Sequence, residues 1–218
     1  MQTTFQFLKG LAKNNSKEWF DANRKTYETG KAEMEGTVKQ IIDRVAKFDK
    51  EIEGLEAKKC LFRINRDIRF SKDKTPYKQN MGASINPGGR KSPLPGYYVH
   101  VEPGKSFLAG GCYAPEPDIL SAIRQEIDYH GTEFRKILNA KDFKTYFGGL
   151  ADEEKVKSAP KGYDKDHPDI ELLKNKHFIV IHYLKDSQVN DKDFPVYAAK
   201  VFKAMHAFNL FLRRCVEK

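Results

Sequence analysis

The sequence predicts an α+β fold: a single domain over residues 1–218, with a mainly antiparallel sheet packed against a long N-terminal helix and a C-terminal helix. Apolar residues recur at helical spacing over residues 17–48 and 194–216. Between these regions, short apolar stretches alternate with Gly and Pro turns, which is typical of strands. Repeated β-α-β units and the glycine-rich motifs of Rossmann and P-loop nucleotide sites do not occur in the sequence. A chain of 218 residues with 39% apolar residues suffices for one substantial core, or at most two small ones.

The N-terminal region is predicted to be helical. Thr4 is expected to cap a first short helix, and Asn14 and Asn15 to end it. Ser16 is a favourable N-cap for the helical pattern that follows. That pattern fits one long amphipathic helix, or two in line, over residues 17–48.

The middle of the chain is predicted to supply most of the sheet. Residues 81–85 are expected to form a strand, and the loop over 86–96 contains glycines and basic residues that give a weak signal for anion binding. Strands over 97–102 and 105–113 are expected to pair as a hairpin. In the first of these strands one face carries Tyr97, Val99 and Val101, and the other carries Tyr98, His100 and Glu102. The Gly-Gly pair at 110–111 indicates a bulge or a close approach of another backbone or a ligand.

A helix and a short strand are predicted to follow this hairpin. Pro115 and Pro117 are typical of a helix start, and Gly131 interrupts the apolar stripe of that helix. A short strand is then expected over residues 143–147.

The C-terminal part is predicted to contain a loop, a strand and a helix. The loop over 148–168 and its end contain closely spaced acids and a histidine, namely Asp164, Asp166, His167 and Asp169. A solvated turn is the better interpretation of these residues, because the spacing of a known metal motif is lacking, and we predict no metal site and no cofactor. Residues 177–184 are apolar on both faces and are expected to form a central strand. His182 lies on one of those faces, either as a core histidine or as a proton donor.

Positive charge is concentrated in residues 58–78. This segment holds eight of the chain's lysines and arginines but only two of its acids, so its local excess of +6 is most of the net +9 of the whole chain. Such a concentration favours an anionic partner. Turn-forming residues at 71–76 predict a strand–turn–strand unit. The basic side chains expected on one side of it are Arg63, Arg69, Lys72, Lys74 and Lys78.

Arg66 breaks the pattern of this segment. Alternation predicts a half-buried strand over residues 62–70, and Arg66 falls among its apolar side chains. A buried guanidinium must be paired. Therefore either Arg66 reaches a carboxylate, or a bulge at Arg66-Asp67 re-aims both side chains. A solvated basic face with one buried Arg–Asp pair is the alternative that requires no function.

Four segments of the sequence can be compared with a known family, and the first of them, an Arg/Asp signature, is specific. They are Arg63-x-x-Arg66-Asp67-x-Arg69-Phe70 followed by Asp73-Lys74 and Tyr77; Asn14-Asn15-x-x-Glu18-Trp19-Phe20; Gly110-Gly111 running into Pro115; and His167-Pro168-x-x-x-Leu172-Leu173. Together they resemble a bacterial family of unknown function, DUF2461, over nearly the whole chain. The resemblance implies no established activity, but it favours a functional role for the Arg/Asp signature.

The first functional hypothesis is a site for a phosphate- or carboxylate-bearing small molecule. The anion-binding residues are predicted to be Arg63, Arg66, Arg69, Lys74 and Lys78. Asp67 would orient an arginine or act as a general base, and Tyr77 or His182 would supply a proton. A nucleophile–base pair is not recognisable from spacing, so the sequence leaves open whether the protein is an enzyme.

Two alternatives come from other classes of protein. A nucleic-acid-binding module would use the basic segment for phosphates and Phe70, Tyr77, Tyr97 or Tyr98 for stacking. The third hypothesis is an interaction domain without a ligand. Three widely spaced cysteines, the lack of a signal-peptide pattern and the lack of a membrane-span pattern lead us to expect a cytoplasmic protein without membrane contact. The sequence does not indicate an oligomeric state.

Overall fold

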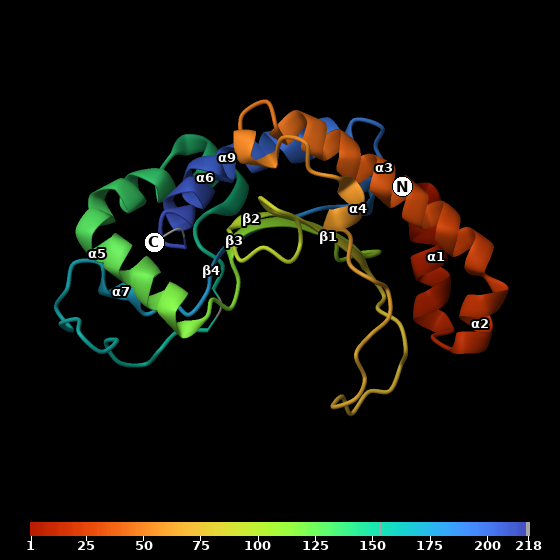
Figure 1. Cartoon of the computed structure of the whole chain (residues 1–218), viewed down its shortest axis with the longest axis horizontal. Helices are drawn as coiled ribbons and strands as arrows, with labels where there is room; N and C mark the ends of the chain where they lie inside the picture. The colour runs from red at the N-terminus through yellow and green to blue at the C-terminus, as the bar shows by residue number, and fades with distance from the viewer. Residues whose placement is uncertain (153, 217–218) are drawn as a thin grey trace. The chain divides into compact units, whose positions relative to one another are not determined.

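The predicted α+β class is confirmed by the computed structural model, which describes residues 1–152 and 154–216 (Figure 1). Its antiparallel sheet has the order β1-β2-β3-β4. The strands are β1 (Met81–Ile85), β2 (Gly96–Val101), β3 (Phe107–Cys112) and β4 (Phe178–Tyr183). The helices of the described residues are α1 (Gln2–Lys13), α2 (Lys17–Ala22), α3 (Arg24–Val45), η1 (Lys50–Ile52), α4 (Ala57–Cys60), α5 (Pro117–Leu138), α6 (Lys141–Phe147), α7 (Ile170–Leu173), α8 (Asp186–Val189) and α9 (Phe194–Arg213). Within these residues, no helix has the length and apolar character needed to cross a bilayer.

The residues group into two compact units. The first unit consists of Met1–Ser92, Tyr97–Leu108 and Tyr183–Lys200, and the second of Pro93–Gly96, Ala109–His182 and Val201–Lys218. A single domain over residues 1–218 stays a prediction.

The helices of the first unit follow the predicted caps with one correction. Ser16 caps α2, because its Oγ accepts a hydrogen bond from the Trp19 amide at 3.2 Å. The pattern over 17–48 is two helices, α2 and α3, which meet at Asn23. Thr4 was expected to cap α1, but the helix begins at Gln2, and the buried Thr4 hydroxyl donates to the Gly30 carbonyl at 2.9 Å. This bond joins α1 to α3 at their close approach.

The predicted alternation of β2 is confirmed in the first unit. β1 and β2 pair antiparallel from Met81↔Val101 to Ile85↔Tyr97. The Tyr97, Val99 and Val101 side chains are buried on one face. The Tyr97 hydroxyl donates to the Asp49 carboxylate at 2.8 Å, which ties this face to the chain after α3. Tyr98 and His100 therefore lie on the opposite face.

Two predictions for the second unit had different outcomes: the close approach at the Gly-Gly pair is confirmed, and the strand over residues 143–147 is wrong. Gly111 has a φ of +107°, and a β carbon there would lie 2.1 Å from the Phe178 carbonyl oxygen, so the expected close approach of another backbone is present. Residues 143–147, predicted to be a strand, belong to α6. Phe143 and Phe147 lie one helical turn apart with ring centroids at 5.1 Å, a spacing that fits a helix better than a strand.

β4 lies at the end of the sheet order and not at its centre as predicted. Its apolar character has another cause. The Ala151 amide, in the connection after α6, donates to the Ile179 carbonyl at 2.9 Å. The connection thus lies against the strand, and Phe178, Ile179 and Val180 are buried although β4 has only one strand neighbour.

Candidate functional site

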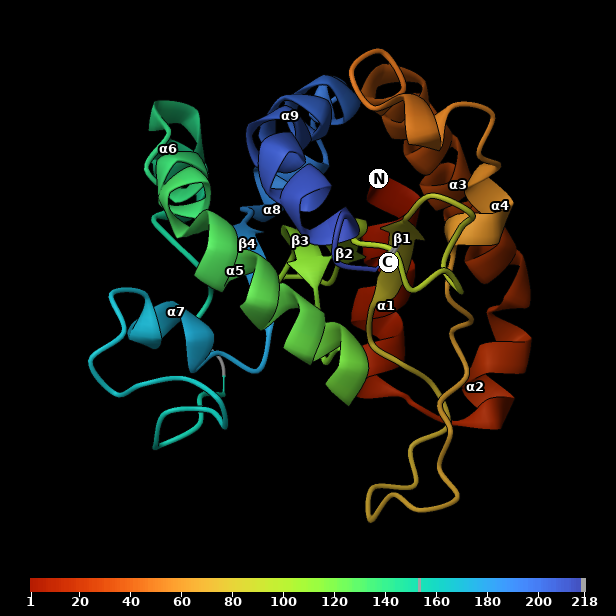
Figure 2. The same ribbon diagram turned by 60° about the vertical axis from the view of Figure 1, so that its left-hand side comes forward.

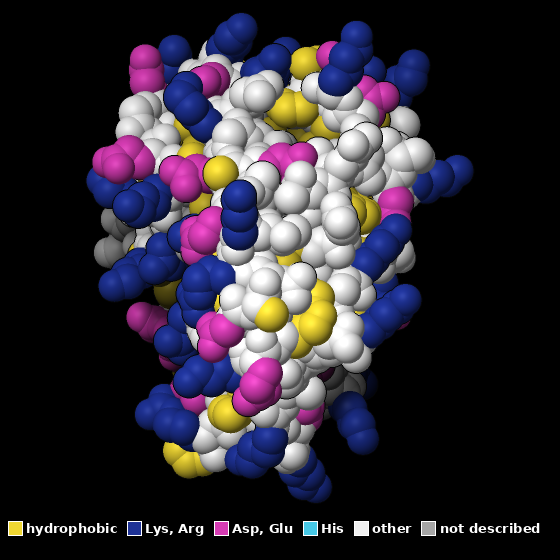
Figure 3. All heavy atoms as spheres, turned by 90° about the vertical axis from the view of Figure 1, so that its right-hand side faces the viewer, with side chains coloured by type: hydrophobic (Ala, Val, Ile, Leu, Met, Phe, Trp, Pro, Cys, Tyr) yellow, Lys and Arg dark blue, Asp and Glu magenta, His cyan; other side chains and the backbone are white. Residues whose placement is uncertain are grey.

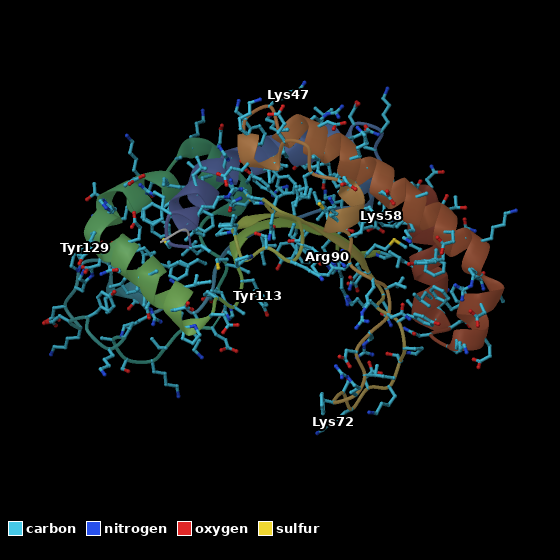
Figure 4. The ribbon with its side chains drawn as sticks, in the orientation of Figure 1. Lys47, Lys58, Lys72, Arg90, Tyr113 and Tyr129 are labelled. Carbon is cyan, nitrogen blue, oxygen red and sulfur yellow. The ribbon has the colours of Figure 1, made fainter. Side chains whose placement is uncertain are left out.

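The basic segment forms an irregular hairpin, residues 61–80, which we call the basic hairpin. Isolated bridges join Leu61 to Ala83 and Asn65 to Tyr77, but no regular strand forms over 62–70, so the strand prediction was wrong there. Phe70, which the alternation placed on the buried face, is 95% exposed. Figures 1 and 2 both show the hairpin projecting away from β1 and from the helices of its unit, and Figure 4 places Lys72 at its far end.

Arg66 holds the two arms of the hairpin together. Its guanidinium donates to the Asp73 carboxylate at 2.6 Å, to the Thr75 carbonyl at 3.0 Å and to the Ser71 hydroxyl at 3.3 Å, and it also contacts the Thr75 hydroxyl. The side chain is 24% exposed. Of the two explanations offered for Arg66, the one in which it reaches a carboxylate is confirmed, and the carboxylate belongs to Asp73.

Asp73 is fixed by the same turn. It accepts hydrogen bonds from the Thr75 amide at 2.9 Å and the Thr75 hydroxyl at 3.0 Å. These bonds, together with Arg66, lower the pKa of the Asp73 carboxyl below its usual value. The turn is therefore organised by an ionised aspartate.

Asp67 orients an arginine, as one of its predicted roles required. The Arg69 guanidinium donates to both Asp67 oxygens, at 3.0 and 2.7 Å, in a bidentate pair. Hydrogen bonds from Arg69 lower the pKa of Asp67, and the positive charge of Arg63 adds to the effect. Lys74 donates to the Ile68 carbonyl at 3.0 Å. A role for Asp67 as general base stays a prediction.

The base of the hairpin is packed against the N-terminal helices. Tyr77 is buried and stacks on Phe20, with ring centroids 4.1 Å apart. Asn15 accepts from the Tyr77 amide at 3.1 Å and donates to its carbonyl at 2.9 Å. Burial raises the pKa of the Tyr77 phenol. Tyr77 therefore anchors the base of the hairpin to the N-terminal helices.

Three basic side chains of the hairpin take no part in these hydrogen bonds and ion pairs among the described residues. Within residues 1–152 and 154–216, Arg63 and Lys72 form no hydrogen bond or ion pair through their side chains. The Lys78 ammonium lies 5.5 Å from the centre of the Phe62 ring. Burial lowers the pKa of Lys78, and the neighbouring charge of Arg63 lowers it further. Arg63 and Lys78 thus place two positive charges near each other.

His182 belongs to the second unit, whereas the other predicted site residues belong to the basic hairpin of the first. Its Nδ1–H donates to the Tyr146 carbonyl at 2.9 Å, and the two rings meet edge to face at 5.4 Å. This contact orients the imidazole within the second unit.

The sequence interpretation missed a row of aromatic side chains, which we call the aromatic strip: Phe62, Tyr98, Phe107 and Tyr183. Successive ring centroids are 6.2, 5.9 and 6.3 Å apart. The strip lies on the face of the first unit's sheet that bears Tyr98, opposite the buried Tyr97. Only Tyr98 could be placed on this face from sequence.

The strip begins at the root of the basic hairpin. Phe62 is the second hairpin residue, and its amide donates to the Gly82 carbonyl of β1 at 3.0 Å. The space-filling view from the side of α1 and α2 shows mainly Lys and Arg side chains at its lower end, where the hairpin lies (Figure 3). Cationic and aromatic groups therefore adjoin in one unit.

Comparison with known proteins gave one match. The model of a family described as conserved hypothetical protein (DUF2461) matches residues 3–211 of the 218. No curated protein and no solved structure matched.

Proposed function

The chain belongs to the DUF2461 family, and we propose that it binds single-stranded nucleic acid, with phosphates on the basic hairpin and bases on the aromatic strip. The observation that supports this proposal is the junction of the two surfaces at Phe62. A cytoplasmic location is part of the proposal and rests on the three widely spaced cysteines.

The aromatic strip supports base binding. Aromatic side chains on an antiparallel sheet stack the unpaired bases of a single strand in several families of nucleic-acid-binding protein. Each base–aromatic stack is worth about 1–3 kcal/mol and tolerates any sequence. Tyr183 is 74% exposed and Phe62 is 42% exposed, so both present ring surface to solvent. Tyr77 and Tyr97, named earlier for stacking, are buried and unsuited to it.

The basic hairpin supports phosphate binding. Arg66 and Arg69 already hold Asp73 and Asp67, which favours a structural role for these two arginines. The side chains of Arg63 and Lys72 are not engaged in this way. A projecting arm with dispersed cations suits an extended backbone better than a single enclosed phosphate.

A phosphate- or carboxylate-bearing small molecule is the second candidate ligand. One observation favours it: Arg63 and Lys78 lie close enough for the charge of one to lower the pKa of the other. A single anion between them would relieve that repulsion. This ligand would bind without help from Tyr183.

Replacing an exposed strip residue tests the proposal. Tyr183→Ala should weaken binding of a short fluorescent single-stranded oligonucleotide by about 5- to 150-fold, which corresponds to the loss of one stack. Tyr129→Ala is the matched control, because Tyr129 is also an exposed tyrosine (69%) but lies on α5 in the second unit. Equal oligonucleotide affinities of the two variants, measured by fluorescence anisotropy, would refute base binding on the strip.

A further inference from the structure

A chain of hydrogen bonds runs along β2 beside the aromatic strip. The Tyr98 hydroxyl lies 3.3 Å from His100 Nδ1, and His100 Nε2 lies 3.0 Å from Glu102 Oε2. The three side chains alternate with the buried Tyr97, Val99 and Val101, so they share the face that the strip occupies. All three belong to the first unit.

The Glu102 carboxylate determines which atoms donate and which accept in this chain of hydrogen bonds. An ionised Glu102 can only accept, so His100 Nε2 carries a proton and donates it to Oε2. In a neutral imidazole Nδ1 is then the acceptor, and the Tyr98 hydroxyl donates to it. A hydroxyl, a base that accepts its proton and a third group that orients the base form the usual arrangement of an activated nucleophile.

The surroundings hold each member in place. The His100 ring stacks on Phe107 at 4.4 Å with an angle of 11°. Glu102 is fixed by Ser106, whose hydroxyl accepts from the Glu102 amide at 3.1 Å and donates to its carbonyl at 2.8 Å. Lys105 lies 3.6 Å from the second Glu102 oxygen. The stack thus restricts the His100 ring, and the Ser106 bonds fix the backbone of Glu102.

Because Gly82 has no side chain, the Tyr98 hydroxyl can lie directly against β1. Gly82 pairs with His100 across β1 and β2. A β carbon at position 82 would lie 2.4 Å from the Tyr98 oxygen. The tyrosine therefore reaches over β1 toward the root of the basic hairpin, where Phe62 contacts it.

We propose that Tyr98, His100 and Glu102 form a catalytic site that hydrolyses phosphodiesters, with Tyr98 as nucleophile, His100 as base and acid, and Glu102 as a positioning residue. The substrate class rests on the proposed function, because a strand whose phosphates lie on the basic hairpin would bring a phosphodiester to Phe62, which contacts Tyr98. Arg63 and Lys78, beside Phe62, would supply positive charge for the phosphoryl group.

The reaction has two balanced steps. In the first step Tyr98 Oη attacks phosphorus while His100 Nδ1 takes the phenolic proton. The bond from phosphorus to the leaving oxygen breaks, and the imidazolium of His100 protonates that oxygen. Water then attacks the phosphotyrosyl group, His100 takes a proton from the water, and the tyrosyl oxygen leaves and regains a proton. One diester and one water give one monoester and one alcohol. Because burial raises the pKa of Tyr98, its proton must be removed during attack, which is the role of His100.

The experiment uses two diesters and the whole 218-residue chain. Bis(p-nitrophenyl) phosphate reports chemistry without strand binding, and a labelled single-stranded oligonucleotide reports binding and cleavage. Tyr98→Phe keeps the ring for stacking and removes the nucleophile. It should lose at least about 100-fold in hydrolysis while its oligonucleotide affinity stays within about twofold. Tyr129→Phe, at an exposed tyrosine of α5 that belongs to neither the strip nor the basic hairpin, is the matched control and should cleave like wild type.

Two further readouts separate catalysis from structure. Intact mass spectrometry of wild type during turnover should detect a phosphorylated Tyr98, which a structural hydroxyl would not form. Glu102→Gln should lower kcat with KM unchanged, because Glu102 acts through His100 and does not touch the substrate. An unchanged kcat in Glu102→Gln would contradict its positioning role.

The outcomes distinguish the two proposals. Binding of the oligonucleotide with no hydrolysis of either diester, or equal rates for wild type and Tyr98→Phe, would overturn the catalytic site and leave strand binding intact. Tyr98-dependent hydrolysis of the small diester without oligonucleotide binding would support the catalytic site and refute the proposed function.

Discussion

Replacing Arg63 and Lys72 together by glutamine should flatten the salt dependence of single-strand binding. Both side chains lie on the basic hairpin without a hydrogen bond or ion pair among residues 1–152 and 154–216. Their removal therefore leaves no acid unpaired, and the fold should keep its stability. Only contacts to ligand phosphates are expected to disappear.

The magnitude follows from counterion release. Each phosphate that a cation neutralises on a single strand contributes about 0.7 to the slope of log K against log salt. Two lost contacts should reduce that slope by about 1.4. If affinity extrapolated to 1 M salt is unchanged, this corresponds to binding about 25-fold weaker at 0.1 M. Salt titrations followed by fluorescence anisotropy measure the slope directly.

A matched double variant controls for total charge. Lys31 and Lys39 on α3 are paired with Glu28 and Asp43, at 4.0 and 2.7 Å. Changing both lysines to glutamine lowers the net charge from +9 to +7, as in the hairpin variant. The control should keep the wild-type slope. Equal slopes for the two double variants would refute the reasoning, because the charge would then act through the whole protein and not through the hairpin.

Two further predictions concern stability and pH. Gly111→Ala combines positive φ with overlap on the Phe178 carbonyl, so it should lower the free energy of unfolding by about 3 kcal/mol or more and lower Tm by about 6–12 °C. Gly148→Ala is also at positive φ but has open space around it, so its loss of stability should be much smaller. Equal losses for the two variants would contradict the packing argument. The hydrogen bonds and ion pair of Asp73 lower its pKa, so its contribution to hairpin order should be complete above the ordinary value and be lost as pH falls through the lowered one. Hydrogen exchange of the Thr75 amide tests this, since Asp73→Asn should remove the acid dependence.

Patterns among residues close together in the sequence correctly predicted several features of single helices and strands. The Ser16 cap, the alternation of β2 and the kink of α5 at His130, next to Gly131, all follow from spacings of a few residues. The helix over 141–147 was missed because a short aromatic segment satisfies strand and helix patterns alike. The position of β4 was missed because burial by a loop and burial by a second strand leave the same apolar sequence.

At the candidate site, too, local features were predicted from the sequence, whereas contacts between separate segments were not. Sequence located the basic segment and the exception at Arg66, but the alternation of Phe62 to Phe70 suggested a strand that does not form. The partner of Arg66 is seven residues away, and the turn predicted over 71–76 did not indicate which side chain Arg66 would reach. The aromatic strip draws its rings from four separate segments, so only sheet pairing brings Phe107 and Tyr183 beside Tyr98.

The most direct test of the account is the dependence of wild-type affinity on ligand length. Anisotropy titrations would compare a labelled mononucleotide with single-stranded oligonucleotides of increasing length at several salt concentrations. The account predicts that affinity rises with length until hairpin and strip are both occupied, and falls steeply with salt. Equal, salt-insensitive binding of the mononucleotide, or no binding of any strand, would contradict it.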